Sequence, residues 1–269
     1  MSEPFQWLGD PSWYLWEGGF LLIGSGRGVV PPHAHHAIQI VIAMDGQVAI
    51  AGGDAVWQQG PGLVVRPDAV HSFDCQGASA AMLFVDPEST EGAWLNSSLT
   101  QDITLMPEAP LAAPASALRT FVERPLEAQE LGTLIRHCVQ ALSPGAPPSR
   151  RIDERVSRVL QQIQGADELR ISLEDSAALA FLSPSRFAHL FTEQMGLPFR
   201  KYVLWRKLTR AMVAIGTGQT IADSAHAADF ADAAHLTRTF YQMVGMAPSA
   251  LMLGRFAQIP PPFSAAGHE

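Results

Sequence analysis

The sequence contains little cysteine, no long apolar run and, in its first half, no lysine. Its 269 residues include only Cys75 and Cys138, too few for a fold stapled by disulfides. No stretch approaches the roughly 20 apolar residues that span a bilayer. The first ten residues, MSEPFQWLGD, lack the basic start of a secretory signal. We therefore expect a cytoplasmic protein that does not enter a membrane, with two structural thiols.

Basic residues are concentrated in the second half of the chain. Residues 1–149 carry five arginines and 15 acidic residues, a net charge of −10, whereas residues 150–269 carry 13 basic and 11 acidic residues, a net charge of +2. The length suits two domains. An acidic half joined to a mildly basic half is typical of a sensor fused to a DNA-binding module.

The hydrophobic pattern predicts an α+β protein of two domains. Short apolar runs such as FLLIG, AIQIVIA and GPGLVVRPD alternate with turn residues over roughly the first 90 residues, which predicts a barrel or sandwich. Asp45-Gly46 is typical of a hairpin between two such strands. Helical spacing follows at 111–142, and SPGAPPS interrupts it. We expect a sensing domain at 1–142, a linker at 143–150, an all-α domain at 151–258 and a disordered tail at 259–269.

Residues 172–196 predict two short helices joined by a tight turn. Ser172 and Asp175 form a capping box, Ser183-Pro184 begins the second helix, and Gly196 ends it. The pattern recurs at 220–245, where Asp232 caps the last helix. Each pair predicts a helix-turn-helix unit, whose second helix enters the major groove of DNA. The outward-facing residues expected to contact DNA are Ser185, Arg186, Ala188, His189, Ala233, Ala234, His235, Thr237 and Arg238.

A single amphipathic helix is expected between the two units, at 198–215. Its apolar face comprises Phe199, Tyr202, Trp205, Leu208 and Met212. The same segment holds the densest basic cluster of the chain, Arg200, Lys201, Arg206, Lys207 and Arg210. We expect Arg206, Lys207 and Arg210 to contact DNA phosphates without reading sequence. A rigid helix would hold the two units in register with successive major grooves, about 34 Å apart.

Segment 151–253 resembles the DNA-binding domain of the AraC/XylS family, in LSPSRFAHLF, MGLPFRKYVLWRKLTRAM and HLTRTFYQMVGMAPSAL. The resemblance implies a transcription regulator that binds double-stranded DNA, forms a homodimer and can contact RNA polymerase. It also implies a DNA contact for Arg238. Phe181 and Asp229 stand where the family has a turn glycine, and Ser224 stands where it buries an aliphatic residue. The departures at Ser224 and Asp229 predict a second unit that is less stable or less exact in its readout.

A histidine cluster is expected in the first domain. His33, His35 and Gln39 occupy alternate positions and would share one face of a strand, joined by His71 from a later strand. The spacing resembles the cupin motifs, with Gln39 in place of glutamate, and implies a cupin-like barrel. These four residues would bind a divalent metal ion, contact an organic effector or form a structural polar cluster. His36 should face the surface.

Ile38, Ile40 and Ile42 make the opposite face of this strand apolar, so that face must also be covered. The cover would be the second sheet, the helices at 111–142 or a second subunit. The first two would be internal packing, whereas the last would be a dimer seam.

The sequence favours a DNA-binding regulator that responds to a small-molecule effector and has no enzymatic activity. Two alternatives remain at this stage. One is a metal-dependent cupin enzyme, such as a dioxygenase, fused to a DNA-binding domain; Gln39 and the lack of other convergent acid–base residues count against it. The other is a co-regulator that acts only through protein contacts.

Overall fold

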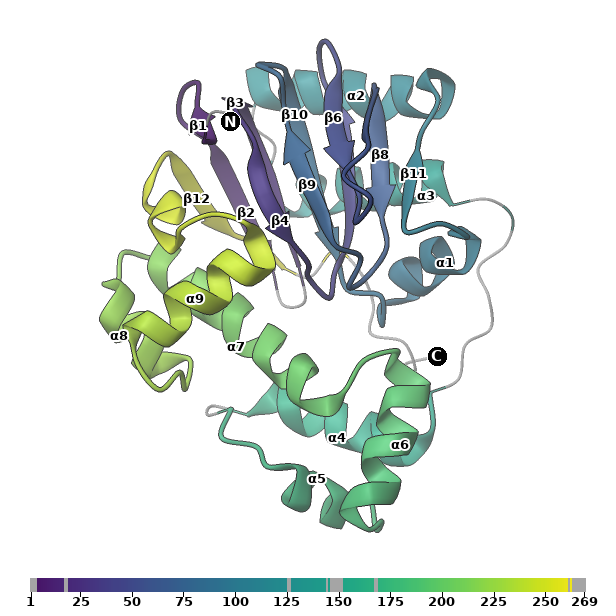
Figure 1. Cartoon of the computed structure of the whole chain (residues 1–269), viewed down its shortest axis with the longest axis vertical. Coiled ribbons are helices and arrows are strands. Elements are labelled where there is room, and N and C mark those ends of the chain that lie inside the picture. Colours follow the sequence, from purple (N-terminus) through teal and green to yellow (C-terminus); the bar gives the residue numbers. More distant parts are fainter. Residues whose placement is uncertain are drawn as a thin grey trace.

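The chain forms a strand-rich lobe above a helical lobe, with helix α7 crossing between them (Figure 1). The computed structural model describes residues 4–16, 19–124, 127–143, 145, 152–166, 169–260 and 262. Most of the expected linker, residues 144 and 146–150, lies outside this range. None of the helices described is long and apolar enough to cross a membrane.

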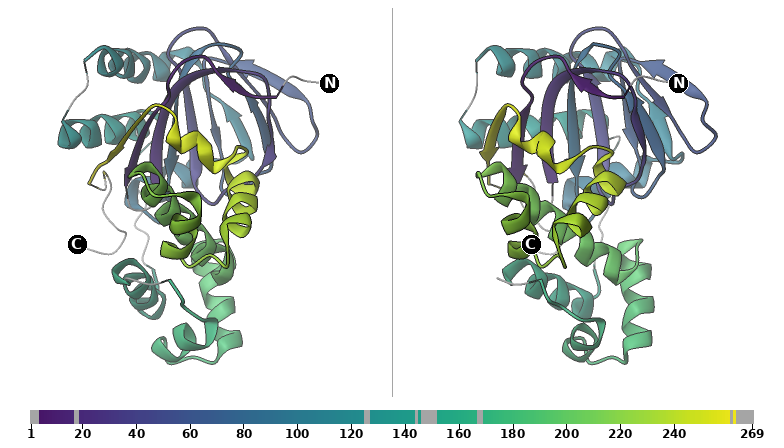
Figure 2. Two further views of the ribbon diagram at one scale, coloured as in Figure 1. Left: turned by 90° about the vertical axis from the view of Figure 1, so that its left-hand side faces the viewer. Right: turned by 60° about the vertical axis from the view of Figure 1, so that its left-hand side comes forward.

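Two sheets curl around a shared apolar core in the upper lobe (Figure 2). The larger sheet has eight strands, in the order β11 (Ile103–Leu105), β8 (Gly62–Val65), β5 (Ile38–Ala43), β10 (Ser79–Val85), β3 (Gly19–Arg27), β2 (Ser12–Trp16) and β12 (Arg255–Gln258), with β1 (Gln6–Trp7) also paired to β3. The smaller sheet runs β4 (Val30–His33), β9 (His71–Asp74), β6 (Val48–Ala51) and β7 (Trp57–Gly60). Fully buried Trp13 and Phe20 fill the space between them, and the Phe20 ring stacks on Phe84 at 4.0 Å between centroids. The expected barrel-like domain is confirmed.

The turn at Asp45-Gly46 is present, but the hairpin predicted around it is wrong. Gly46 has the positive φ of +61° that the turn requires. However, β5 pairs with β8 and β10, whereas β6 pairs with β7 and β9. The turn therefore carries the chain from one sheet to the other, because both strands find partners that come later in the sequence.

Helix α1 (Thr90–Ser98) follows β10, and helices α2 (Glu108–Glu123) and α3 (Ala128–Leu142) follow β11. Helices α2 and α3 cover the outer face of the larger sheet (Figure 2). Ile38, Ile40 and Ile42 pack there with side chains that include Leu118, Phe121 and Ile135. The second apolar face of β5 is thus buried by the chain's own helices, which is the internal packing weighed above, and not by a second subunit.

The helical lobe contains α4 (Glu154–Gly165), α5 (Leu173–Leu179), α6 (Pro184–Met195), α7 (Phe199–Gly216), α8 (Ile221–Ala227), α9 (Ala233–Val244) and the short 3-10 helix η1 (Pro248–Met252). Around α5 and α6 the first helix-turn-helix unit has a core of its own, centred on Phe187 and Phe191. The second unit does not. Leu236 and Phe240 of α9 belong to the same buried cluster as Trp13 of the barrel.

The end of the chain returns to the barrel. Strand β12 pairs in parallel with β2, and the Ile259 amide N–H donates to the Leu15 carbonyl at 2.8 Å. Ile259 is buried, and Arg136 of α3 donates to the Pro262 carbonyl at 2.9 Å. The expected disorder from residue 259 is therefore wrong for Ile259 and Pro262, and the expected all-α domain to residue 258 is wrong for Arg255–Gln258, which join the barrel sheet because β2 offers them a free edge. The rest of the tail, residues 261 and 263–269, lies outside the described residues.

We predict that Ile259→Ala lowers the free energy of unfolding by about 2–5 kcal/mol, the usual cost of removing a buried aliphatic side chain. Met252→Ala is the control, because Met252 is 61% exposed and its loss should change stability by no more than about 0.5 kcal/mol. Urea denaturation of the intact protein measures both. Equal midpoints for Ile259→Ala and the wild type would show that the Ile259 side chain contributes no packing energy.

Candidate functional site

Both second helices of the helix-turn-helix units begin and end as the sequence predicts. The Ser183 hydroxyl accepts from the Arg186 amide at the start of α6, with Pro184 in the first turn. The Asp232 carboxylate accepts from the His235 amide at 2.6 Å at the start of α9. Gly196 and Gly245 end the helices with positive φ. These caps satisfy terminal backbone groups locally, which is why the sequence predicts the boundaries well.

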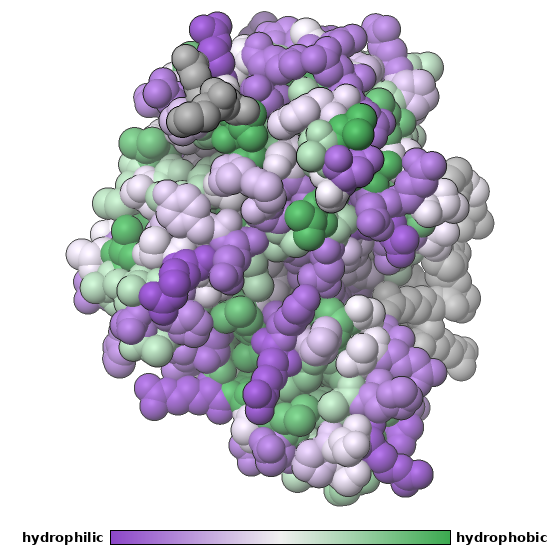
Figure 3. Space-filling model, in the orientation of Figure 1, coloured by the Kyte–Doolittle hydropathy of each residue, from purple (hydrophilic) through white to green (hydrophobic). Residues whose placement is uncertain are grey.

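The residues expected to contact DNA lie on the outer faces of α6 and α9. Ser185, Arg186 and His189 of α6 are exposed, as are Ala234 and Arg238 of α9. The remaining four are half-buried, namely Ala188, Ala233, His235 and Thr237. On the face drawn in Figure 3, apolar side chains form separate patches among polar ones over both lobes. Each helix can therefore present polar and small side chains to a DNA groove.

The basic residues in the middle of α7 contact protein in this structure, contrary to our expectation that they face DNA. Arg206 is buried, with its Nη1 3.5 Å from an Asp86 carboxylate oxygen of the barrel lobe. Lys207 donates to the Asp229 carbonyl at 2.8 Å, and Arg210 donates to the Ala166 carbonyl at 2.7 Å. The sequence already indicates that Arg206 is enclosed, because it follows buried Tyr202 by one helical turn and so shares the same face of the helix.

Arg200 and Lys201, at the start of α7, remain exposed. The Lys201 ammonium lies 3.7 Å from the Asp68 carboxylate, and the Lys201 side chain is 60% exposed. Such an exposed pair contributes little energy, so it does not prevent Lys201 from meeting a phosphate. Both residues belong to the basic cluster that the sequence predicts to attract phosphates, although the specific contacts were expected from the other three.

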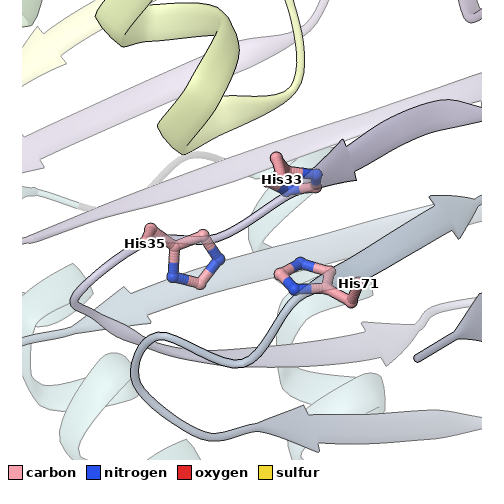
Figure 4. A group of neighbouring side chains, drawn as sticks. All are labelled: His33, His35 and His71. Atoms are coloured by element: carbon pink, nitrogen blue, oxygen red, sulfur yellow. The ribbon is translucent and has the colours of Figure 1, made fainter. Parts of the chain in front are cut away.

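Three of the four residues proposed for the barrel site converge, and the fourth adjoins them. His33, His35 and His71 each bring one ring nitrogen within 4.8 Å of the others, and their rings gather between β4 and β9 (Figure 4). The Gln39 amide oxygen lies 3.1 Å from His35 Nε2. The expected strand is interrupted, however, since β4 ends at His33 and β5 begins at Ile38. His35 therefore comes from the connection between two sheets.

Backbone carbonyls fix the orientation of all three histidine rings. The Nδ1 atoms of His33, His35 and His71 lie 2.8–2.9 Å from the carbonyls of Pro31, Ala37 and Ala69, respectively. Donation from Nδ1–H leaves Nε2 with its lone pair. The buried Nε2 of His71 has no hydrogen-bond partner within the part of the chain described. A histidine that ligates a metal commonly has this arrangement, in which the far nitrogen is held by a carbonyl.

The His35 ring also contacts two acceptors, the Ala37 carbonyl and the Gln39 amide oxygen. A neutral imidazole has only one N–H, so it cannot donate to both. A cation between Nε2 and the Gln39 oxygen would satisfy this pair, as would rotation of the amide group.

Burial keeps the three histidines neutral. Desolvation, reinforced by neighbouring His35, lowers the pKa of His33 to about 4. Burial also lowers the pKa of His35 and that of His71, and His33 repels a proton on His71. Near neutral pH the site is consequently a set of uncharged nitrogen lone pairs, which is the form that binds metal ions.

His36 is buried, so the expectation that it faces the surface is wrong. Because the strand is interrupted at residues 34–37, strict alternation does not apply there. The His36 ring donates to Glu88. Burial opposes protonation of His36, but Glu88 and Asp86 outweigh it and raise the His36 pKa. Burial and repulsion from Glu88 raise the pKa of Asp86, against the attraction of Arg206.

Helix α7 lies directly against these buried residues of the barrel. The Trp205 indole N–H donates to Asp86 at 3.1 Å, and its ring centroid is 6.5 Å from that of His35. The Tyr202 ring lies edge-on to His36 at 6.0 Å. Helix α7, which connects the two DNA-binding units, therefore contacts both the histidine cluster and the neighbouring Asp86.

The end of α9 closes the other side of the histidine cluster (Figure 4). The Ala34 amide donates to the Gln242 carbonyl at 3.1 Å. A Cβ atom on Gly245 would lie 2.4 Å from a Val30 methyl and 2.8 Å from His33 Nδ1. The backbone of the second recognition helix is thus packed against β4 and His33 at a position that tolerates no side chain.

Comparisons with known proteins agree with this arrangement. A helix-turn-helix domain family model matches residues 176–253. The chain is 23% identical over 232 residues to the probable transcriptional regulator LumQ of Photobacterium leiognathi, covering 81% of this chain and 90% of that relative. ToxT from Vibrio cholerae O395 has the same fold, with a TM-score of 0.55 and 12% identity over 93% of this chain and 98% of ToxT. An unliganded ToxT variant gives a TM-score of 0.57 at 12% identity, over 87% of this chain and 97% of that one.

Residues 176–253 form an AraC-type helix-turn-helix domain, and the chain is similar over most of its length to transcription regulators. The family model covers both helix-turn-helix units, and the two-lobed fold is that of ToxT. The motifs of the second half and the barrel of the first half thus belong to one architecture, as the sequence indicated.

The turns of both helix-turn-helix units adopt a left-handed backbone at a residue other than glycine. Phe181 has φ of 55° and Asp229 has φ of 58°, and this conformation costs a residue with a side chain roughly 1–2 kcal/mol. Phe181 is 83% exposed, and the Arg158 guanidinium carbon lies 5.4 Å from its ring centroid. The Asp229 carboxylate instead accepts from the Leu169 amide and pairs with Arg170.

We predict opposite results when glycine replaces these two residues. Phe181→Gly should raise the free energy of unfolding by about 0.5–1 kcal/mol, because it relieves strain and removes few contacts. Asp229→Gly should lower it by about 1–3 kcal/mol, because the Leu169 amide and Arg170 lose a carboxylate partner. Thermal unfolding of both variants measures the difference. A gain in stability for Asp229→Gly would mean that its hydrogen bonds contribute less than its backbone strain costs.

Proposed function

We propose that this regulator binds promoter DNA through α6 and α9, and that occupancy of the histidine site controls this binding. The observation that carries the proposal is contact: the His33–His35–His71 site adjoins α7 through Trp205 and α9 through Gly245. A ligand that prefers one arrangement of these contacts must shift the equilibrium between arrangements of the DNA-binding units. Homodimerisation and contact with RNA polymerase remain predictions from the family.

For DNA recognition, we infer that α6 and α9 read bases and that the start of α7 contacts phosphates. The exposed arginines Arg186 and Arg238 suit guanine, whose O6 and N7 accept a bidentate arginine. Arg200 and Lys201 are exposed, whereas Arg206 is engaged with Asp86. We therefore assign the phosphate contacts to Arg200 and Lys201, in place of Arg206, Lys207 and Arg210.

We predict that the Arg200→Ala, Lys201→Ala double variant flattens the slope of log K against log salt by about 1.8, since each lost phosphate contact removes about 0.9. The control is Arg206→Met, which should leave the slope unchanged. Fluorescence anisotropy with a promoter fragment at several salt concentrations measures both. An unchanged slope for the double variant, with a flattened slope for Arg206→Met, would restore the original assignment.

For the histidine site, we infer a divalent metal ion held by His33, His35, His71 and the Gln39 oxygen. The fit rests on three neutral imidazoles with fixed Nδ1–H groups and on the unpartnered Nε2 of His71. Imidazole suits zinc, copper, iron and nickel. The large rings of Trp13, Phe20 and Phe84 fill the barrel nearby, which favours an ion over a bulky organic effector here. A bound ion would fix the positions of the histidines that α7 and α9 touch.

We predict that the apo protein, prepared with EDTA and dialysed, takes up about one zinc or nickel ion per chain. His71→Ala should weaken this binding by at least about ten-fold, whereas His137→Ala should not, because His137 is an exposed residue on α3. Metal content by mass spectrometry and calorimetric titration report the affinity. If both variants retain metal like the wild type, the cluster is not the site.

Control of DNA binding is tested on the same proteins. We expect DNA affinity to differ by roughly 5–150-fold between the metal-loaded and apo wild type, and to be insensitive to metal in His71→Ala. A metal that binds without changing DNA affinity would leave the site structural and refute the regulatory part of the proposal.

A further inference from the structure

Phe181, in the turn of the first helix-turn-helix unit, occupies a backbone position that is suited to glycine. The amide N–H groups of Phe181 and Leu182 donate to the carbonyls of Ala178 and Ala177 at 3.0 and 2.9 Å, respectively. This pair of hydrogen bonds ends α5 and requires a left-handed residue directly after the helix, which explains the φ of 55° at Phe181. Glycine adopts this conformation freely, whereas a residue with a side chain is strained there.

The Phe181 side chain contributes almost no packing that could offset this strain. The ring is exposed, and it is not part of the buried core of the first unit. Its ring contact is with Arg158 of α4, which is itself exposed. Asp229 in the second unit differs, because its carboxylate accepts from the Leu169 amide. Phe181 thus combines backbone strain with an apolar ring in water, and strain that persists in a folded protein often marks a functional position.

The exposed ring lies next to the part of α6 that is expected to meet DNA. Phe181 precedes Ser183, the cap of α6, and the exposed surface continues through Ser183–Arg186 to His189. The first unit lies at the end of the helical lobe away from the barrel (Figure 1), so the barrel does not cover this turn. Since the N-terminal residues of a recognition helix contact base edges, the turn before α6 comes close to the wall of the groove.

The charges around Phe181 suit a polyanion. From Ser176 to Thr192 the chain has no acidic residue, and this segment includes Arg186. The Arg158 guanidinium lies beside the ring and donates to the Leu179 carbonyl at 3.3 Å, which holds it there. Phosphates are attracted to such positive charge while the ring meets apolar parts of a nucleotide. The turn therefore favours DNA over an apolar protein surface as its partner.

We propose that Phe181 packs against DNA at the edge of the groove that α6 enters, on a thymine methyl group or on a deoxyribose. Phenylalanine contacts thymine methyl groups in this way when it reaches a groove. The proposal rests on DNA binding by α6, as proposed above, and adds a contact at a position where the family pattern has glycine. Binding to DNA would remove the ring from water, so the side chain that is unfavourable in the free protein becomes favourable in the complex.

The test separates stability from DNA affinity. Phe181→Gly should be more stable than the wild type, as predicted above, yet bind DNA about five- to ten-fold more weakly, because no ring leaves water on binding. The probe is a fluorescent duplex selected from a random pool by the wild-type protein, and anisotropy measures its affinity. The salt dependence should stay the same, since an apolar contact releases no counterions.

Phe181→Leu keeps an apolar side chain and should retain most of the affinity. A loss as large as that of Phe181→Gly would contradict an apolar contact. Val122→Ala is the control, because it removes a 51% exposed apolar side chain from α2 of the other lobe and should bind DNA like the wild type.

Arg186→Ala distinguishes a failure of this inference from a failure of the proposed function. If Arg186→Ala binds weakly but Phe181→Gly binds like the wild type, DNA binding by α6 stands and the contact by Phe181 is refuted, which leaves a protein as the partner of the ring. If the wild type selects no duplex from the pool, both proposals are wrong.

Deoxyuridine distinguishes the two apolar surfaces of DNA, because it lacks only the methyl group of thymidine. We replace the thymidines of the duplex one at a time. A replacement that weakens wild-type binding by about four-fold, the value of one buried methyl group, and leaves Phe181→Gly unaffected would identify a thymine methyl group as the contact. If no replacement does so while Phe181→Gly still binds weakly, the ring contacts a deoxyribose. Either result supports the proposal.

Discussion

The burial of α7 against the barrel is the contact on which the rest of this structure depends. Trp205 is fully buried, its indole N–H donates to Asp86, and its ring lies beside His35. A tryptophan buries a large apolar surface and needs a partner for its single N–H, and the barrel supplies both. Since α7 also packs with the first unit through Tyr202 and with the second through Met212, fixing this helix positions both units relative to the barrel.

This contact explains why the basic residues of α7 divide into two groups. Residues on the barrel side, such as Arg206, are enclosed with the helix and must be paired, because an unpaired buried charge is costly. Asp86 provides that pairing. Arg200 and Lys201 precede the buried stretch and stay in solvent. One helix therefore serves two purposes: its exposed start is available to DNA, and its enclosed middle links the DNA-binding units to the sensing lobe.

Local features of the fold could be predicted from the sequence, and distant pairings could not. Ser183, Asp232 and Gly196 act on residues within one helical turn, so capping rules locate both recognition helices. The motif spacing predicts that Gln39, His35 and His71 converge on one site. The structure brings them together, although His35 does not lie on a continuous strand as alternation requires. The sequence misplaces His36 and Arg206 and gives no sign of β12, because their partners, Glu88, Asp86 and β2, lie 52 residues or more away in the chain. Sequence periodicity describes which face of an element is apolar, but not what covers it.

Ser224 and Asp229, which differ from the family pattern in the second unit, affect the stability of a unit whose buried cluster is shared with the barrel. Ser224 is fully buried, and its hydroxyl has no hydrogen-bond partner among the residues described, which costs free energy where an aliphatic side chain would contribute it. Asp229 adds backbone strain in the same unit. The buried cluster of this unit, which includes Leu236 and Phe240, is continuous with that of the barrel, and Gly245 closely approaches His33.

That continuity makes the second unit suited to regulation. The first unit has an independent core around Phe187 and Phe191, so a change in the barrel need not disturb it. The buried cluster of the second unit is continuous with that of the barrel, and a small movement at His33 acts directly on Gly245 at the end of α9. The segments that move in allosteric proteins are drawn from their less stable parts. The chain thus places its second DNA-binding unit directly against its candidate sensing site, where a change of about 1–3 kcal/mol is enough to alter DNA affinity.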